Sequence, residues 1–353
     1  MKVVVLGLSI TSSWGNGHAT NFRALQRALV ARGHDVLFLE RDKPWYASNR
    51  DLPNPPWGRT ELYDSVDDLQ DRFAGEISSA DLVIVGSYVP DGVEVARWVT
   101  SATGGSVAFY DIDTPVTVAA AERGECEYLT PDVIPLFDTY LSFTGGPTLD
   151  RLEQQYGARR ALAFHCLVDA DAYRPRDVAI TWDLGYLGTY SDDRQPTVER
   201  LLIEPARRRP DLRFVVAGPQ YPDSIDWPDN VERIDHLPPS EHPAFYAAQR
   251  FTLNVTRADM IAAGWSPSVR LFEAAACGVP VISDRWEGIE TFFDPRSEMV
   301  LADTADDVVA ALDGIDDERR RAMGAAARAR VLDRDTAEHR AATLEELVGE
   351  RVA

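Results

Sequence analysis

Cysteine and long apolar runs are scarce in this chain, and each scarcity excludes a class of protein. The three cysteines, Cys126, Cys166 and Cys277, lie far apart and have no C-x-x-C spacing. They therefore argue against a disulfide framework and a cysteine-ligated zinc site, and they favour a reducing compartment. No segment approaches the roughly 20 apolar residues that a membrane-spanning helix needs.

Positive charge is also deficient. Lys2 and Lys43 are the only lysines, and 36 basic residues stand against 57 acidic ones, for a formal net charge of −21. We therefore expect neither nucleic acid nor an anionic membrane surface as a general partner. The apolar run 3–10 passes into TSSWGNGH without a cleavage-site pattern, so we interpret it as a strand and expect a cytoplasmic protein. The oligomeric state stays open.

The 353 residues are enough for two domains, and β-rich apolar runs alternate with helical patterns throughout. This rhythm predicts an α/β protein with two doubly wound, Rossmann-like parallel-sheet domains joined near 168–175. We expect strands at 2–8, 35–40, 82–86, 106–110, 139–143 and 161–165, and then at 183–187, 213–217, 231–234, 252–255, 279–283 and 299–301. The clearest helices are expected at 20–32, 197–208, 243–248, 269–277 and 304–314, with a last one at 336–350.

The stretch 42–63 is rich in Pro, Trp, Tyr and Arg and predicts an irregular loop, either lining a cleft or packed on the surface.

The most informative segment is 266–293, SPSVRLFEAAACGVPVISDRWEGIETFF. Ser266, Pro267 and Ser268 predict a capped helix start, and a helix N-terminus is a seat for phosphate. Glu273, about one and a half turns further on, carries a carboxylate that can accept hydrogen bonds from a ribose diol. The pair predicts a nucleotide site, with an ordinary αβ unit and a chance Glu as the alternative.

The first βα turn contains Gly15, Asn16, Gly17 and His18. Glycines there allow a ligand to approach the backbone at a helix N-terminus. The segment is not G-x-G-x-x-G, so it does not predict a dinucleotide. His18 has the chemistry of a general base, although a loop His is more often structural.

Asp111 and Asp113 follow the predicted strand 106–110, at the sheet edge where such folds bind ligands. Either carboxylate is a candidate to orient His18 or to be the base itself. The same Asp-x-Asp pattern also suits oxygen ligation of Mg or Mn, and capping of the next segment would explain one of the two.

Several residues near predicted strand ends of the second half are candidates for binding a nucleotide sugar. Arginine forks clamp diphosphates, and glycines let a base rest against backbone. The set is Tyr190, Arg194, Gly218, His236, Arg257, Ser268, Arg270 and Glu273, beside Gly15 and Gly17 of the first half. Surface salt bridges would explain any single arginine.

With these residues in view, the chain resembles GT-B-type glycosyltransferases, and most of all the spore-maturation CgeB-like group of nucleotide-sugar-dependent enzymes. The resemblance is strongest over 254–293, NVTR…GWSPSVRLFEAAACGVPVISDRWEGIETFF. The segments ERDKPWYASNRD, FYDIDTPVT, YLSFTGGP, VDADAYRP and TAEHRA are similar to bacterial members as well.

The resemblance implies a GT-B fold with a cleft between the domains: residues 1–170 on the acceptor side and 171–335 holding the nucleotide sugar. Helix 336–353 is implied to pack back on the first domain. Glu273 takes the position of a ribose-binding Glu, but the partner Glu of an E-x7-E pair is Trp265 here, so stereochemistry does not carry over. His18 is similar to the base of some inverting members, and no metal or other cofactor is implied.

These observations predict a glycosyltransferase that moves a sugar from a nucleotide-diphosphate donor, with UDP as the expected nucleotide, to an acceptor hydroxyl. Two alternatives stay open: a sugar-nucleotide 2-epimerase of the same fold, and a non-catalytic nucleotide-binding homologue. The sequence identifies neither the sugar nor the acceptor.

Overall fold

The computed structural model describes residues 1–14 and 17–352, with side chains up to residue 350. The chain divides into two compact units. The first domain comprises residues 1–167 and 337–353, and the second comprises 168–336. The division therefore falls between Leu167 and Val168, at the start of the segment 168–175 where the sequence placed the join.

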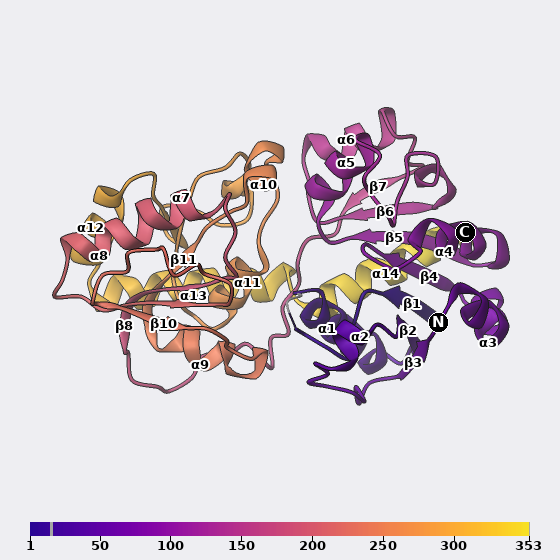
Figure 1. Ribbon diagram of the computed structural model, residues 1–353, viewed down its shortest axis with the longest axis horizontal. Coiled ribbons are helices and arrows are strands. Elements are labelled where there is room, and N and C mark those ends of the chain that lie inside the picture. Colours follow the sequence, from indigo (N-terminus) through magenta and orange to yellow (C-terminus); the bar gives the residue numbers. More distant parts are fainter. Residues whose placement is uncertain (15–16, 353) are drawn as a thin grey trace. The chain divides into compact units, whose positions relative to one another are not determined.

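In the described part of the first domain, the strands form a seven-stranded parallel sheet in the order β3-β2-β1-β4-β5-β6-β7 (Figure 1). The strands are β1 (Lys2–Gly7), β2 (Asp35–Arg41), β3 (Arg59–Tyr63), β4 (Leu82–Gly86), β5 (Ser106–Asp111), β6 (Thr139–Ser142) and β7 (Ala161–Ala163). The helices are α1 (His18–Ala31), α2 (Pro44–Ala47), α3 (Val66–Ser78), α4 (Gly92–Ala102), α5 (Thr114–Glu122), α6 (Pro147–Gln154) and α14 (Ala337–Val352), with a 3-10 turn at Ile134–Leu136. The strand order changes direction between β1 and β4, which marks the usual ligand position of such sheets.

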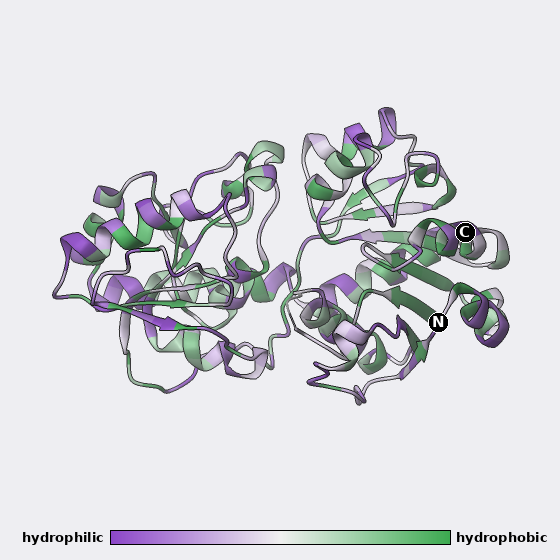
Figure 2. Ribbon diagram, viewed as in Figure 1, coloured by the Kyte–Doolittle hydropathy of each residue, from purple (hydrophilic) through white to green (hydrophobic). Residues whose placement is uncertain are grey.

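The central strands are apolar because helices cover both faces of a doubly wound sheet. Val3, Val4, Val83 and Ile84 are essentially inaccessible to solvent. Figure 2 shows β1 and β4 in the green of hydrophobic residues.

The terminal helix α14 belongs to the first domain. Its Glu345 accepts hydrogen bonds from Arg32 Nε at 2.9 Å and pairs with His34 Nε2 at 2.6 Å. The guanidinium of Arg340 binds the carbonyl of His165 at 3.1 Å. These contacts fix the helix to the loops after α1 and β7.

In the described residues of the second domain, a six-stranded parallel sheet has the order β10-β9-β8-β11-β12-β13. Its strands are β8 (Trp182–Leu187), β9 (Phe214–Ala217), β10 (Val231–Ile234), β11 (Gln249–Asn254), β12 (Val281–Ser283) and β13 (Met299–Leu301). The α-helices are α7 (Gln195–Val198), α8 (Glu204–Arg208), α9 (His242–Ala247), α10 (Ala258–Ala263), α11 (Val269–Ala276), α12 (Ala305–Gly314) and α13 (Asp317–Arg334); a π turn spans Glu199–Ile203, and 3-10 turns span Pro239–Glu241 and Ile289–Thr291. The order changes direction between β8 and β11.

The prediction of two doubly wound parallel-sheet domains is confirmed, and the structure corrects or refines some local predictions. The stretch 42–63 is not an irregular loop throughout, since it contains α2 and the edge strand β3. The helix predicted at 197–208 is interrupted by a π turn, and Pro205 has no N–H for the carbonyl four residues earlier. Helix α1 begins at His18 and not at residue 20. In the described residues, none of the helices has the length and hydropathy to cross a membrane.

Candidate functional site

The side chain of Arg270 lies where the strand order of the second domain changes direction. Its Nε donates to the carbonyl of Leu187 at the end of β8, at 2.6 Å. Its Nη1 donates to Asn254 Oδ1 at the end of β11, at 2.8 Å. One guanidinium from the first turn of α11 therefore joins the carboxyl ends of the two central strands, where ligands of open α/β sheets bind.

Asn254 organises this junction. Its Oδ1 also accepts from the Ser268 hydroxyl at 2.6 Å, and its Nδ2 donates to Thr256 and Ser283. Ser268 is the N-cap residue of α11, but its hydroxyl makes no capping bond to the helix. The predicted side-chain cap is therefore wrong. The Ser268 hydroxyl donates to Asn254 and accepts no hydrogen bond from the first backbone N–H groups of α11.

Two donors converge on this helix start. Tyr186 is fully buried beneath Arg270, whose guanidinium carbon lies 4.7 Å from the ring centroid. Among the described residues, neither the Tyr186 hydroxyl nor Arg270 Nη2 has a hydrogen-bond partner. A buried donor without a partner is costly, so this arrangement suits an anionic ligand at the uncapped helix N-terminus.

Gly188 forms one wall of the junction. A Cβ atom at this position would lie 2.6 Å from the Tyr186 hydroxyl and 3.0 Å from Arg270 Nη2. Gly218 has φ +144°, and a Cβ there would lie 2.1 Å from the Gly188 carbonyl oxygen. Glycine at both positions lets the loops after β8 and β9 approach each other closely.

The other predicted residues of this domain lie on neighbouring loops. Arg194 Nη2 is bound to the Thr189 carbonyl at 2.6 Å, and the Tyr190 hydroxyl donates to Asp192 at 2.6 Å. Arg257, the N-cap residue of α10, has its Nε 3.9 Å from Asp193 Oδ2. His236 is exposed just after β10. No contact in the described residues joins these side chains to Arg270.

Glu273 is less open than the sequence suggested. It is 4% exposed, and its Oε2 accepts from the buried Tyr246 hydroxyl at 2.9 Å. The buried Tyr173 hydroxyl also interacts with this carboxylate, so two tyrosines face Glu273. The ribose-binding role of Glu273 stays a prediction.

In the first domain, His18 and Asp113 meet near the β1–β4 junction. His18 Nε2 lies 3.9 Å from Asp113 Oδ2, and the same oxygen accepts from the Tyr88 hydroxyl at 3.1 Å. His18 is 8% exposed, and its buried Nδ1 has no partner in the part of the chain that the structure describes. Asp113 precedes α5 without capping it.

Asp111 does not share that position. It is inaccessible to solvent, and its oxygens accept from the Tyr140 and Thr117 hydroxyls and from the backbone of Asp113. Burial raises the pKa of its carboxyl to about 6, against the opposing effect of these hydrogen bonds. Asp111 is therefore a poor candidate for a base or a metal ligand, because its carboxylate is sealed from solvent and from any substrate hydroxyl or metal ion. In the described residues, no group of three or more His, Cys, Asp or Glu side chains is arranged to hold a metal.

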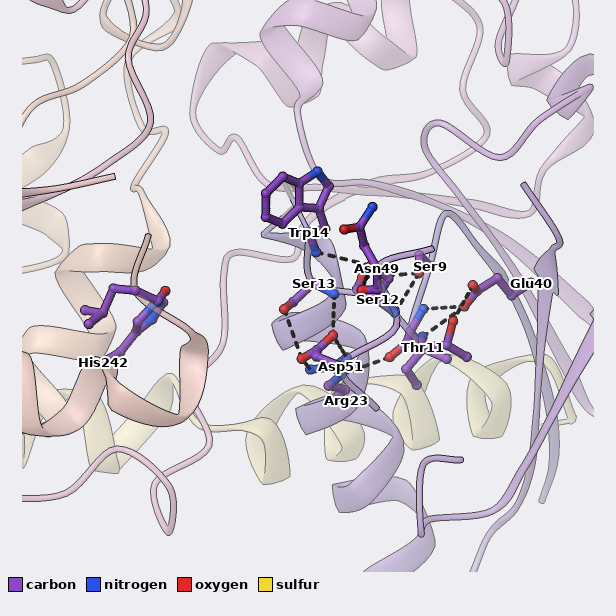
Figure 3. A network of polar contacts seen from close by, with 12 residues as sticks. Ser9, Thr11, Ser12, Ser13, Trp14, Arg23, Glu40, Asn49, Asp51 and His242 are labelled. Carbon is purple, nitrogen blue, oxygen red and sulfur yellow. Dashed lines mark hydrogen bonds and ion pairs between the residues drawn. The ribbon is translucent and has the colours of Figure 1, made fainter. Parts of the chain in front are cut away.

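Polar contacts order the loop that follows β1 (Figure 3). Glu40, at the end of β2, is fully buried and accepts from the backbone of Ile10 and Thr11. Asp51 accepts from both terminal nitrogens of Arg23 and from Ser13. Although burial alone would raise the pKa of Asp51, these donors hold it at about 2. Residues 10–13, between β1 and α1, are thereby held by Glu40 and Asp51.

The predicted glycines of this loop contribute less. Gly15, with Asn16, lies outside the described residues. Gly17 is the residue before α1, its φ of −76° suits any residue, and a Cβ atom there would meet nothing within 4 Å. Its glycine is not required by the backbone.

Tyr88, Tyr186 and Asn254 were not predicted from the sequence. Tyr186 and Asn254 are buried strand residues, and their apolar neighbours conceal them. Tyr88 lies two residues beyond the end of β4, and no motif or periodicity singles it out.

Residues 194–346 match the model of a family described as "Glycosyl transferase-like". The search of the curated proteins found no match to this sequence.

Solved structures match over the whole chain. The sucrose-phosphate synthase of Thermosynechococcus elongatus has a TM-score of 0.71 at 15% identity, covering 100% of this chain and 99% of that one. Anabaena HepE in complex with UDP and glucose has a TM-score of 0.69 at 13% identity, covering 99% and 100%. A glycosyltransferase from Rickettsia africae ESF-5 has a TM-score of 0.68 at 11% identity, covering 99% and 98%. The chain therefore has the GT-B fold of two Rossmann-like domains.

Proposed function

We propose that the protein is a glycosyltransferase that moves a sugar, most simply a hexose, from a UDP-linked donor to an acceptor hydroxyl. The donor is held by the second domain and the acceptor by the first. Support comes from the GT-B fold, from the family model over residues 194–346, and from the UDP in the structure of Anabaena HepE. We keep the CgeB-like group as the proposed subfamily.

The observation that carries the proposal is the pair of unpartnered donors at the start of α11. The diphosphate would take the Tyr186 hydroxyl, Arg270 Nη2 and the uncapped backbone N–H groups. Negative charge grows on this diphosphate as the sugar leaves, so donors already held in place stabilise the transition state. The Asn254 network holds them in place.

The remaining residues have supporting roles in this proposal. Glu273 accepts the ribose hydroxyls through Oε1, while Tyr246 fixes its other oxygen. Tyr190, Gly218 and His236 border the base, and Arg194 and Arg257 add positive charge. No metal or other cofactor is part of the proposal. The three cysteines are not joined in a disulfide, which supports the proposed cytoplasmic location.

His18 is the proposed base and Asp113 its partner. The acceptor O–H bond breaks as its proton passes to His18, and the acceptor oxygen forms a bond to the anomeric carbon. The bond from that carbon to the phosphate oxygen breaks at the same time, and UDP leaves with the electron pair.

Calorimetry with UDP, GDP and dTDP tests the donor site. UDP should bind, and Arg270→Met should weaken its binding by about 1.5–3 kcal/mol, the range for a charged hydrogen bond. Arg296→Met is the control, because Arg296 is exposed and pairs only with the neighbouring Asp294. Equal UDP affinity in wild type and Arg270→Met would contradict this site.

Turnover is tested with UDP-glucose and a panel of hydroxyl acceptors, by NMR. A new glycoside with release of UDP is the expected result. A changed sugar still attached to UDP would identify an epimerase, and binding without any reaction would identify a non-catalytic homologue.

A further inference from the structure

We propose that Tyr88 is a positioning residue, whose hydroxyl holds the Asp113 carboxylate in the orientation that directs His18. This inference rests on the proposed role of His18 as the base. Sequence patterns gave no sign of Tyr88, and its role follows from three contacts and from its backbone conformation.

One oxygen of Asp113 faces both partners. Asp113 Oδ2 accepts from the Tyr88 hydroxyl at 3.1 Å and lies 3.9 Å from His18 Nε2. A carboxylate oxygen can accept two hydrogen bonds, so Tyr88 does not exclude His18. The rotation of the carboxylate is fixed by Tyr88, and a small movement brings Oδ2 within hydrogen-bond reach of the imidazole.

The backbone at Tyr88 is strained. Its φ is +62°, a left-handed conformation that costs a bulky residue about 1–2 kcal/mol. The preceding Ser87 accepts from the backbone N–H of Ile112 at 3.1 Å, which ties this turn to the Asp113 loop. Such strain persists only where the surroundings hold it, and here it brings the phenol onto Asp113.

Ring contacts fix the phenol itself. The Tyr88 ring lies 4.6 Å from the Tyr128 ring and 5.3 Å from the His18 ring, centroid to centroid. Burial and the nearby Asp113 raise the pKa of Tyr88 well above its usual value, so the hydroxyl keeps its proton and remains a donor. Tyr88 therefore contacts both members of the proposed pair.

The arrangement selects one form of His18. With its proton on Nε2, facing Asp113, the imidazole leaves the lone pair on Nδ1. Nδ1 is the nitrogen that is buried without a partner among the described residues. Because Nδ1 is buried, an acceptor hydroxyl donates to it only once the side chains that cover it move, and Asp113 then stabilises the imidazolium that forms.

The test is the protonation site of neutral His18, read from the ¹⁵N shifts of the imidazole. The chain has six histidines, so the His18 signals are identified by their loss in His18→Gln. Wild type should carry the proton on Nε2, and Tyr88→Phe should lower the fraction of that form. Tyr63→Phe is the control, because the Tyr63 hydroxyl is buried in the same domain with no hydrogen-bond partner among the described residues.

The second readout is the release of UDP from UDP-glucose, with water as the acceptor if no other is known. Tyr88→Phe should reduce kcat roughly tenfold or more with the donor KM unchanged, while Tyr63→Phe should change neither. Wild-type kcat and protonation site in Tyr88→Phe would overturn the inference. A proton on Nδ1 in the wild type would also overturn it, even if Tyr88→Phe fails to fold. Absence of turnover would count against the proposed function alone, because the NMR measurement needs no reaction.

Discussion

The guanidinium carbon of Arg270 lies 4.7 Å from the ring centroid of Tyr186, whose buried hydroxyl has no hydrogen-bond partner among the described residues. Buried hydroxyls without a partner also occur away from this position among the described residues, as at Tyr63 and Tyr110. The position of Tyr186 and Arg270 at the β8–β11 junction, where ligands of open α/β sheets bind, is therefore what supports the proposed site.

Tyr186→Phe separates binding from folding. The substitution removes a buried hydroxyl that has no partner, so we expect unchanged or slightly higher thermal stability. UDP affinity should fall by about 1–3 kcal/mol, because the lost hydrogen bond is to a charged group. Thermal unfolding and calorimetry measure the two quantities.

The matched control is Tyr63→Phe. Tyr63 is also buried with an unpartnered hydroxyl, but it belongs to β3 of the first domain. This variant should keep both stability and UDP affinity. Wild-type affinity in Tyr186→Phe would remove the hydroxyl from the site.

Gly188→Ala should block the same site. The added methyl group would lie 2.6 Å from the Tyr186 hydroxyl and 3.0 Å from Arg270 Nη2, closer than side chains pack. We expect at least a tenfold loss of UDP affinity and a loss of stability of about 1–3 kcal/mol, typical of overpacking. Gly75→Ala in α3 meets no atom within 4 Å and should raise stability by about 0.5–1 kcal/mol. A stable Gly188→Ala protein that binds UDP normally would show that the junction has room to spare.

Glu273 is expected to have two separable roles. Glu273→Ala should lower stability by about 1–3 kcal/mol, because the buried Tyr246 hydroxyl loses its acceptor. It should also weaken UDP binding through the loss of Oε1. The double variant Glu273→Ala/Tyr246→Phe should recover much of the stability but not the affinity, since removing both partners is nearly neutral. Recovery of both would show that Glu273 acts only as the acceptor of Tyr246.

The central strands could be predicted because apolar runs such as VVVL of β1 and LVIV of β4 have no other stable place than a covered sheet. β3 was missed because the edge strand RTELY is mostly polar and half-exposed. Tyr63 is the one residue of this strand that is buried, and its burial depends on tertiary contacts that the sequence pattern does not contain.

The site could be predicted only in part. Arg270 was selected from its place near a strand end, and the structure locates it at the β8–β11 junction. The sequence did not contain the information that Ser268 binds Asn254 instead of α11, that Tyr246 occupies one oxygen of Glu273, or that Asp111 is sealed. Each of these facts depends on which buried side chains lie close together in the folded domain. A local sequence pattern does not specify which side chains these are.

Asp111 should make the stability of the protein depend on pH. Burial raises the pKa of its carboxyl to about 6 in the folded state, above the usual 3.8. The unfolded chain releases this proton at a lower pH than the folded chain does. The contribution of Asp111 to the free energy of unfolding is therefore largest below about pH 4 and falls as the pH rises towards 6. A shift of about two units corresponds to roughly 3 kcal/mol. Carboxylates with lowered pKa, such as Asp51, act in the opposite sense and at lower pH.

The measurement is therefore the difference in free energy of unfolding between wild type and Asp111→Asn, by chemical denaturation from pH 4 to 8. The wild type should lose stability relative to Asp111→Asn between pH 4 and 6 and keep a constant difference above pH 7. Parallel curves across the whole range would show that the buried carboxyl titrates alike in both states.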